Sequence, residues 1–138
     1  MRSAVTLTLD SSAAFDLLVA DTPQRNWLRQ FVAGHDFVAP VLFRFELTNL
    51  IRRAFAQKQL SDTDANATLR AALSMPLTEY SFEFALPRAW ALRGSFTFTD
   101  ASYIAVAEAT GTALVTLDRR IARGPTVHCD IVLPPRTG

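Results

Sequence analysis

Four acidic residues in this chain stand beside apolar segments, where a carboxylate is expected to be at least partly buried. They are Asp10, Glu46, Asp100 and Asp118. Asp10 follows the β-prone run 4–9 (AVTLTL), and Asp118 follows the apolar run 113–117 (ALVTL), so both are predicted at the carboxyl ends of strands. Open α/β sheets bind their ligands at that edge, which makes it the expected place for chemistry.

These residue types predict a divalent metal. Four carboxylates cannot share a dry cleft as anions, because like charges raise one another's pKa and burial adds to the effect. Oxygen ligands with no histidine or cysteine nearby select Mg²⁺ or Mn²⁺ over zinc. Such an ion can hold a phosphodiester, generate hydroxide from water and stabilise the leaving oxygen. The prediction rests on the set of four, because a single Asp at a strand end or helix start is more often a turn or cap residue.

The segment that begins near Asp100 is predicted to be a buried helix. It reads ASYIAVAEA, is nearly continuous in small and apolar residues, and stops at Gly111. Two N-termini fit the sequence: Thr99 as N-cap with Asp100 in the first turn, or Thr97 as N-cap with Asp100 at the third helical position. In both cases a carboxylate lies at the positive end of a helix.

Strands and helices alternate along the rest of the chain. Pro87 falls inside one expected helix and should either kink it or mark its true start. The alternation, with no internal repeat or linker, predicts a single α/β layer sandwich with a mostly parallel sheet, followed by a loose tail at 134–138. The expected strands are 4–9, 37–39, 77–80, 113–117 and 126–133, and the expected helices are 13–20, 23–33, 41–56, 61–73, 82–92, 99–110 and a turn at 119–123.

Composition agrees with a soluble globular protein. The chain has 138 residues, 49% of them hydrophobic, and no apolar run approaches the roughly 20 residues of a membrane-spanning helix. A single cysteine, Cys129, and the absence of a signal-peptide core favour the cytoplasm. The net charge of +1 does not demand a nucleic-acid partner, but Lys58 is the only lysine among 14 basic residues, and arginine suits bidentate phosphate contacts. A GC-rich genome would produce the same arginine bias.

Four short segments, taken in order and with their spacing, resemble the PIN-domain ribonucleases, specifically toxins of the VapC type. The resemblance covers essentially the whole chain, residues 1–138, and includes the sequence AWALR before the third acidic segment. The segments are LDSS at Asp10, FELTN at Glu46, FTDASYIAVAEA at Asp100 and LVTLDRR at Asp118.

The resemblance implies a single PIN domain, a three-layer α/β/α sandwich with a central, mostly parallel sheet of four or five strands. It also implies a toxin that is a Mg²⁺- or Mn²⁺-dependent endoribonuclease cleaving single-stranded RNA, with a homodimer and a VapB-like antitoxin as partners. By the family pattern Asp10, Glu46, Asp100 and Asp118 form the catalytic and metal-binding site. Ser12 and Thr116 are its supporting polar residues.

Basic residues beside the acids suggest where RNA would bind. Arg119, Arg120 and Arg123 follow directly on Asp118, and a rim of arginine around an acidic centre suits a phosphate backbone. Surface arginines are also common without such a role.

Two other functions compete with the nuclease. A phosphohydrolase of the haloacid-dehalogenase kind would need a second Asp two residues after Asp10, where this chain has Ser12. A catalytically idle module that only binds a metal or a partner is compatible with the same carboxylates.

Overall fold

The computed structural model describes residues 5–19 and 22–136. Within them, strands and helices alternate as the sequence predicts. The strands are β1 (Thr6–Leu9), β2 (Asp36–Pro40), β3 (Leu77–Tyr80), β4 (Ala113–Val115) and β5 (Ile131–Val132). The helices are α1 (Ser11–Val19), α2 (Pro23–Val32), α3 (Leu42–Ala56), α4 (Asp62–Leu73), α5 (Phe82–Ala91), α6 (Phe98–Thr110) and α7 (Arg119–Ala122).

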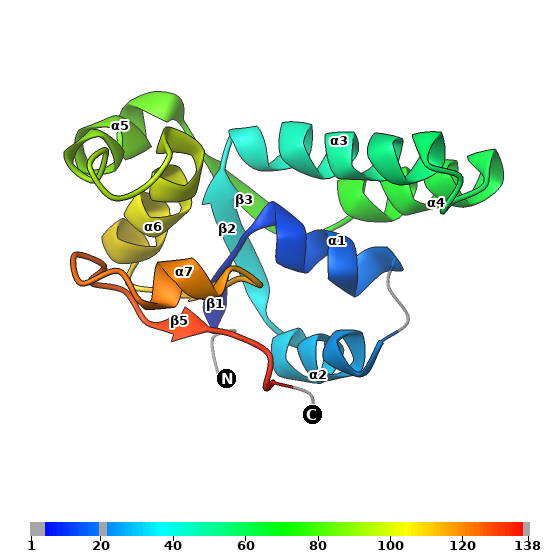
Figure 1. Cartoon of the computed structure of the whole chain (residues 1–138), viewed down its shortest axis with the longest axis horizontal. Coiled ribbons are helices and arrows are strands. Elements are labelled where there is room, and N and C mark those ends of the chain that lie inside the picture. Colours follow the sequence, from blue (N-terminus) through cyan, green and yellow to red (C-terminus); the bar gives the residue numbers. More distant parts are fainter. Residues whose placement is uncertain (1–4, 20–21, 137–138) are drawn as a thin grey trace.

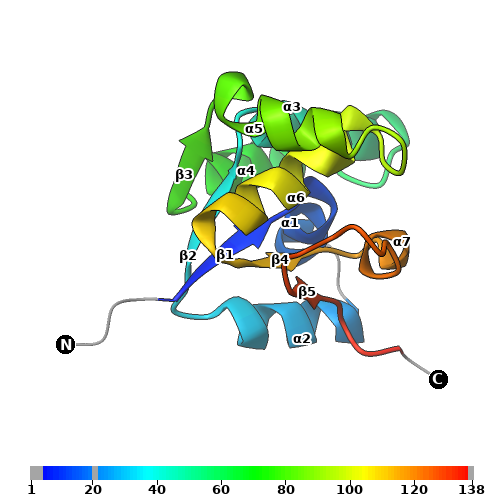
Figure 2. The ribbon, with the colours of Figure 1, turned by 90° about the vertical axis from the view of Figure 1, so that its left-hand side faces the viewer.

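The five strands form one sheet in the order β3-β2-β1-β4-β5, and every neighbouring pair is parallel. The predicted α/β sandwich is confirmed, and the open choice of four or five strands is settled at five. Helices α1 to α4 lie on one side of the sheet, and α5 and α6 lie on the other, as Figures 1 and 2 show from two directions. Because helical connections join these parallel strands, the carboxyl ends of all five lie at one edge of the sheet.

Side-chain caps define where several helices begin. Thr22, Ser61, Ser81 and Thr97 each accept a hydrogen bond from the backbone N–H three residues later. Thr97, rather than Thr99, is therefore the N-cap of α6. At its other end α6 stops at Gly111, whose φ of +66° is in the left-handed region that glycine adopts without strain.

The structure corrects several boundaries. The first helix begins at Ser11, two residues early, because the Asp10 carboxylate accepts the Ala13 N–H and caps it. Strand β4 ends at Val115 instead of residue 117. The last strand covers only Ile131–Val132 of the expected 126–133.

The structure also shows where Pro87 and the C-terminal segment from Pro134 lie. Pro87 lies inside α5, which starts from the Ser81 cap, so it does not mark the start. The expected loose tail begins with a buried residue, Pro134, whose carbonyl accepts a 2.6 Å hydrogen bond from Arg119. In α3 the side chains that face the core are Phe43, Leu47, Ile51 and Ala54.

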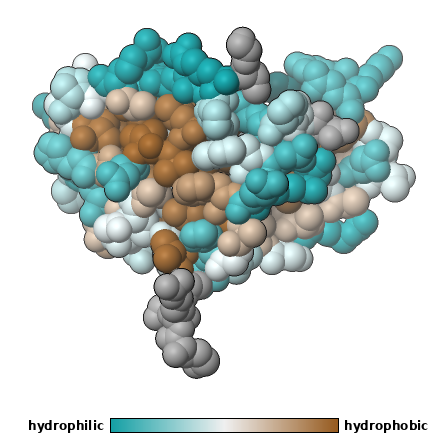
Figure 3. All heavy atoms as spheres, turned by 90° about the horizontal axis from the view of Figure 1, so that it is seen from below, coloured by the Kyte–Doolittle hydropathy of each residue, from teal (hydrophilic) through white to brown (hydrophobic). Residues whose placement is uncertain are grey.

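Apolar side chains also reach the surface. Phe45 and Phe55 on α3 are exposed, and so are Phe82 and Trp90 on α5. The face of the molecule seen from below carries a further apolar patch bordered by hydrophilic residues (Figure 3). Within the described residues, no helix combines the length and apolarity needed to cross a membrane.

Candidate active site

Asp10 is the most buried of the four acids. It follows β1 directly, is 8% exposed, and accepts hydrogen bonds from Ser12 Oγ (2.7 Å) and the Ala13 N–H (2.9 Å) at Oδ1. Its Oδ2 accepts a hydrogen bond from the hydroxyl of Thr116, which is fully buried. Burial raises the pKa of the Asp10 carboxyl, although these three donors favour its anion. The two supporting residues expected from the sequence therefore both contact Asp10.

Glu46 lies in the second turn of α3 and is held from two other helices. Its Oε1 accepts a 2.6 Å hydrogen bond from the hydroxyl of Tyr103 on α6 and a longer one, 3.4 Å, from Ser11 Oγ on α1. Burial raises the pKa of Glu46, and the negative charges of Asp100 and Asp10 add to this rise. The donated hydrogen bonds act in the opposite direction.

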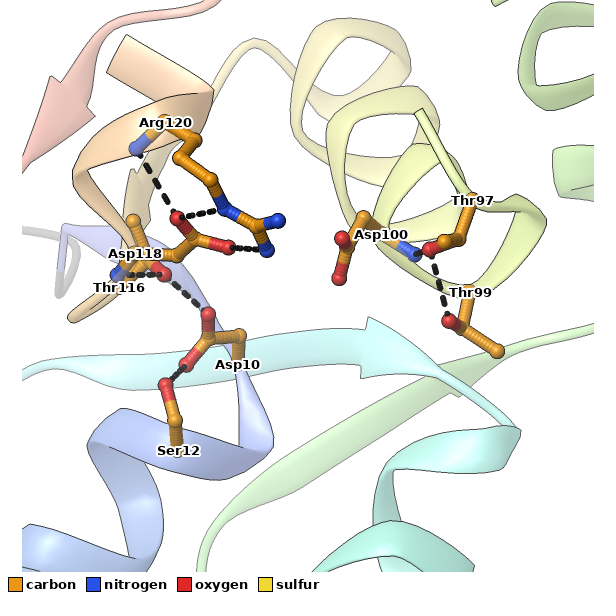
Figure 4. A network of polar contacts seen from close by, with 8 residues as sticks. All are labelled: Asp10, Ser12, Thr97, Thr99, Asp100, Thr116, Asp118 and Arg120. Atoms are coloured by element: carbon orange, nitrogen blue, oxygen red, sulfur yellow. Dashed lines mark hydrogen bonds and ion pairs between the residues drawn. The ribbon is translucent and has the colours of Figure 1, made fainter. Parts of the chain in front are cut away.

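Asp100 is the third residue of α6, in the first turn that Thr97 caps. Its negative charge also contributes to the raised pKa of Asp10, after the larger effect of burial. Figure 4 shows Asp10, Asp100 and Asp118 in one region, from the residue after β1, from α6 and from the segment after β4. The Asp100 carboxylate faces Asp118 and Arg120, whereas the Asp10 carboxylate turns to Ser12 and Thr116. The structure thus brings together acids that are up to 108 positions apart, 118 minus 10, in the sequence.

Asp118 differs from the other three because a cation neutralises it. Both of its oxygens accept hydrogen bonds from the Arg120 guanidinium, at 3.0 Å from Nε and 2.7 Å from Nη2. The Arg120 backbone N–H donates a third, at 2.9 Å, so Asp118 also caps the short helix α7. These hydrogen bonds from Arg120 lower the pKa of Asp118.

A cavity of about 650 Å³ opens beside this cluster and has basic walls. Asp100 and Asp118 line it together with Arg93, Arg120 and Arg123. Two of the three arginines expected to contact RNA therefore lie at the site. The third, Arg119, instead directs its guanidinium to the Pro134 carbonyl.

The donor chemistry of the site fits a hard divalent cation. Asp10, Glu46 and Asp100 have no basic partner within 4 Å among the residues that the structure describes, so their like charges are uncompensated. All donors are oxygen atoms, the type that Mg²⁺ and Mn²⁺ prefer. Among the residues that the structure describes, however, no three acidic, histidine or cysteine side chains have the mutual spacing of a metal site. The ion pair with Arg120 occupies Asp118, one of the four expected ligands.

Tyr103 and Arg93 belong to the site but were not among the residues expected from the sequence. Tyr103, which holds Glu46, follows Asp100 by three positions, and this spacing on a helix puts both on one face. That periodicity could have identified it. Arg93 lines the cavity but lies in the loop after α5, and no local pattern indicates its position.

Comparisons with known proteins agree with this arrangement. The family model described as PIN domain matches residues 7–126. Ribonuclease VapC12 of Mycobacterium tuberculosis is 31% identical over 127 residues, which is 92% of this chain and 98% of that protein.

Two solved structures share the fold. The crystal structure of VapC20 from Mycobacterium tuberculosis, described as a Sarcin-Ricin loop cleaving toxin, aligns with a TM-score of 0.64 and 18% identity. The alignment covers 86% of this chain and 95% of VapC20. The crystal structure of VapBC2 from Rickettsia felis, bound to a DNA fragment from its promoter, aligns with a TM-score of 0.64 and 13% identity, over 92% of this chain and 98% of that one.

Proposed function

The chain belongs to the PIN-domain family and, within it, to the VapC ribonuclease toxins, and from this we propose that it is a Mg²⁺- or Mn²⁺-dependent endoribonuclease that cleaves single-stranded RNA. The proposal takes residues 1–138 as one PIN domain. One observation carries it: carboxylates gather at the carboxyl edge of the sheet beside a cavity with arginines in its wall, and in the described residues only Asp118 among them has an ion-pair partner. An RNA backbone needs both parts, a centre for hydrolysis and cations for its phosphates.

The metal would be held by Asp10, Asp100 and Asp118 with Glu46, and it would supply Lewis-acid activation of water and of the phosphodiester. The protein's own part is to fix the donor atoms. Three hydrogen bonds fix Asp10, and Tyr103 with Ser11 fixes Glu46. Such supporting contacts orient ligand oxygens and restrict their motion.

Arg93, Arg120 and Arg123 are proposed to bind the RNA strand. They lie in the wall of the cavity that Asp100 and Asp118 share. A single strand can enter an open cavity and expose its phosphates to guanidinium groups, whereas a duplex holds its phosphates at fixed spacing.

The two rival functions make different predictions. Ser12 occupies the position where a haloacid-dehalogenase-like enzyme needs its second Asp, and its hydroxyl donates to Asp10, which suits an orienting role. An idle binding module would hold Mn²⁺ without turnover.

The deciding assay incubates purified protein with total RNA, with and without Mn²⁺ or Mg²⁺. A matched Asp100→Asn variant keeps the size of the side chain and the Thr97 cap, since the cap bonds to its backbone. Cleavage that needs both the metal and Asp100 supports the nuclease. Metal binding without cleavage by the wild type would favour the idle module, and cleavage that persists in a chelator would refute the proposed metal site.

The partners belong to the same proposal. A ribonuclease toxin that acts on its host's RNA requires an inhibitor, so we expect a VapB-like antitoxin that covers the acidic cleft with an arginine and the exposed aromatics with an amphipathic segment. Phe45 is 78% exposed and lines a groove on α3 with polar and basic side chains around it, Arg44, Thr48, Asn49 and Arg52, a surface that also suits a homodimer. Trp27 on α2 is less available for such a contact, because it is half-buried and stacks on Phe31.

Growth after induction tests the toxin role. The wild type should arrest growth, and the Asp100→Asn variant at a matched protein level should not. Equal growth of the two cultures would contradict the toxin role and leave the ribonuclease assay unaffected.

A further inference from the structure

Arg120 engages the whole carboxylate of Asp118. One guanidinium nitrogen bonds each oxygen, and the backbone N–H of the same residue bonds Oδ1 as well. Figure 4 shows the guanidinium reaching from Asp118 into the space in front of Asp100. Of the four site acids, Asp118 alone has an ion-pair partner in residues 5–19 and 22–136.

Arg120 takes three of the roughly four acceptor sites of the Asp118 carboxylate. A metal ion at the same carboxylate would compete with the guanidinium for these oxygens, and the two positive charges would repel each other. Coordination of a metal ion by Asp118 is therefore favoured when the guanidinium has moved away.

Arg120 is placed so that it can move. Its side chain is 76% exposed, and it belongs to α7, a four-residue helix that lies at the surface of the molecule. The Asp118 side chain is only 25% exposed and the pair is bidentate, but its cationic partner is on the solvent side, where water can take over the guanidinium when a divalent cation displaces it. A released arginine at the wall of the cavity is long enough to bind a phosphate there with its planar fork.

We propose that Arg120 is an exchangeable counter-cation of the acidic site, which gives up Asp118 when Mg²⁺ or Mn²⁺ binds and then binds a phosphate of the RNA strand. This proposal rests on the proposed function. It assigns one residue two successive partners, and it predicts that removing its charge has opposite effects on metal binding and on RNA binding.

The first measurement is the affinity for Mn²⁺ alone, from the electron paramagnetic resonance signal of the free ion at low salt. Arg120→Gln removes the competing cation and should bind Mn²⁺ about two- to fivefold more tightly than the wild type, the range expected for an exposed ion pair. Arg123→Gln is the matched control. It removes the same charge from the same cavity, but no hydrogen bond joins Arg123 to Asp118 among the described residues, so its change should be clearly smaller.

The second measurement is the binding of a 12-nucleotide single-stranded RNA by fluorescence anisotropy over a series of salt concentrations. Ca²⁺ replaces Mn²⁺ so that the RNA stays intact, which a gel verifies. Arg120→Gln should bind the RNA more weakly, and the slope of log affinity against log salt should fall by about 0.7, the value for one phosphate contact with a single strand. Arg120→Lys keeps a charge for the phosphate without the bidentate fork, so it should bind Mn²⁺ more tightly while retaining the slope of the wild type.

The outcomes separate this proposal from the one on which it rests. If Arg120→Gln leaves Mn²⁺ affinity unchanged or weakens it, while the wild type binds Mn²⁺ and cleaves RNA, the exchange is refuted and the nuclease stands. If the wild type binds no Mn²⁺, both proposals fail. A thermal melt of each variant confirms that the fold is intact, as the exposure of Arg120 leads us to expect.

Discussion

Replacing Thr116 by valine tests how much the Thr116 hydroxyl stabilises the buried carboxylate of Asp10, and with it the folded protein. The side chain of Thr116 is fully buried, its hydroxyl donates to Asp10 Oδ2, and its oxygen accepts the Asp118 N–H at 3.0 Å. Valine has nearly the same shape but can make neither bond. The backbone N–H of residue 116, which bonds the Val132 carbonyl, is unaffected.

The expected loss of stability follows from these two bonds. A hydrogen bond to a charged group contributes about 1.5–3 kcal/mol, and an unsatisfied amide costs about 1–3 kcal/mol. The added methyl group recovers about 0.8 kcal/mol. We therefore expect the free energy of unfolding to fall by about 2–4 kcal/mol at pH 7 in a chelator, which corresponds to a Tm about 10 °C lower for a domain of this size.

Thr8→Val is the matched control. Thr8 is also fully buried, but its hydroxyl bonds the neutral hydroxyl of Thr112 at 2.6 Å, so its loss should cost only about 1 kcal/mol. The two variants should also differ in pH dependence. Without Thr116 the pKa of Asp10 rises further, so the cost of Thr116→Val is greatest where Asp10 is ionised and shrinks as the pH falls. Urea unfolding from pH 5 to pH 8 measures both, and equal, pH-independent losses for the two variants would refute the reasoning.

Three further outcomes are expected. Because burial raises the pKa of Asp10 and Glu46, the folded state binds more protons than the unfolded chain. The free energy of unfolding, measured by urea titration in a chelator, should therefore rise as the pH falls from 8 to 5. Asp10→Asn should make this rise smaller. Tyr103→Phe should lower kcat/KM for RNA cleavage about tenfold, since Glu46 loses its 2.6 Å donor, while circular dichroism stays unchanged; an unaltered rate would leave that contact without a catalytic role. A chelator should abolish cleavage on a gel, and Mn²⁺ or Mg²⁺ but not Ca²⁺ should restore it, because Ca²⁺ has looser geometry and activates water poorly. Recovery with Ca²⁺ would contradict this reasoning.

One physical rule allowed both the sheet and the proximity of the acidic residues to be predicted from the sequence. Hydrophobic runs that end in Asp10 and Asp118 are strands, parallel strands end at one edge, and a helix that begins at the same edge carries Asp100. Local patterns of this kind survive folding because tertiary packing reinforces them. For the N-cap of α6 the sequence left two threonines open, and in the structure Thr97 accepts the hydrogen bond of the Asp100 N–H.

Side-chain partners could not be predicted in the same way. The spacing from Asp100 puts Tyr103 on the face of the helix that carries the site, but no local rule identifies its partner Glu46, which is 57 positions away in the sequence. The Arg120 ion pair depends on a rotamer at the surface. The last strand lies at the edge of the sheet and pairs with β4 over only two residues, Ile131 and Val132, and no local pattern in 126–133 marks that limit.

The order of the strands has a consequence for how the protein is made. Strand β1 leaves the ribosome first, yet its second neighbour in the sheet is β4, which follows more than 100 residues later. The hydroxyl that holds Asp10 comes from Thr116, also in this late segment. A growing chain that has produced only β1 to β3 therefore has Asp10 without its donor and lacks Asp118 altogether. The acidic site is thus complete only after nearly the whole chain has been translated, so on the proposed function a chain that stops before β4 should lack ribonuclease activity.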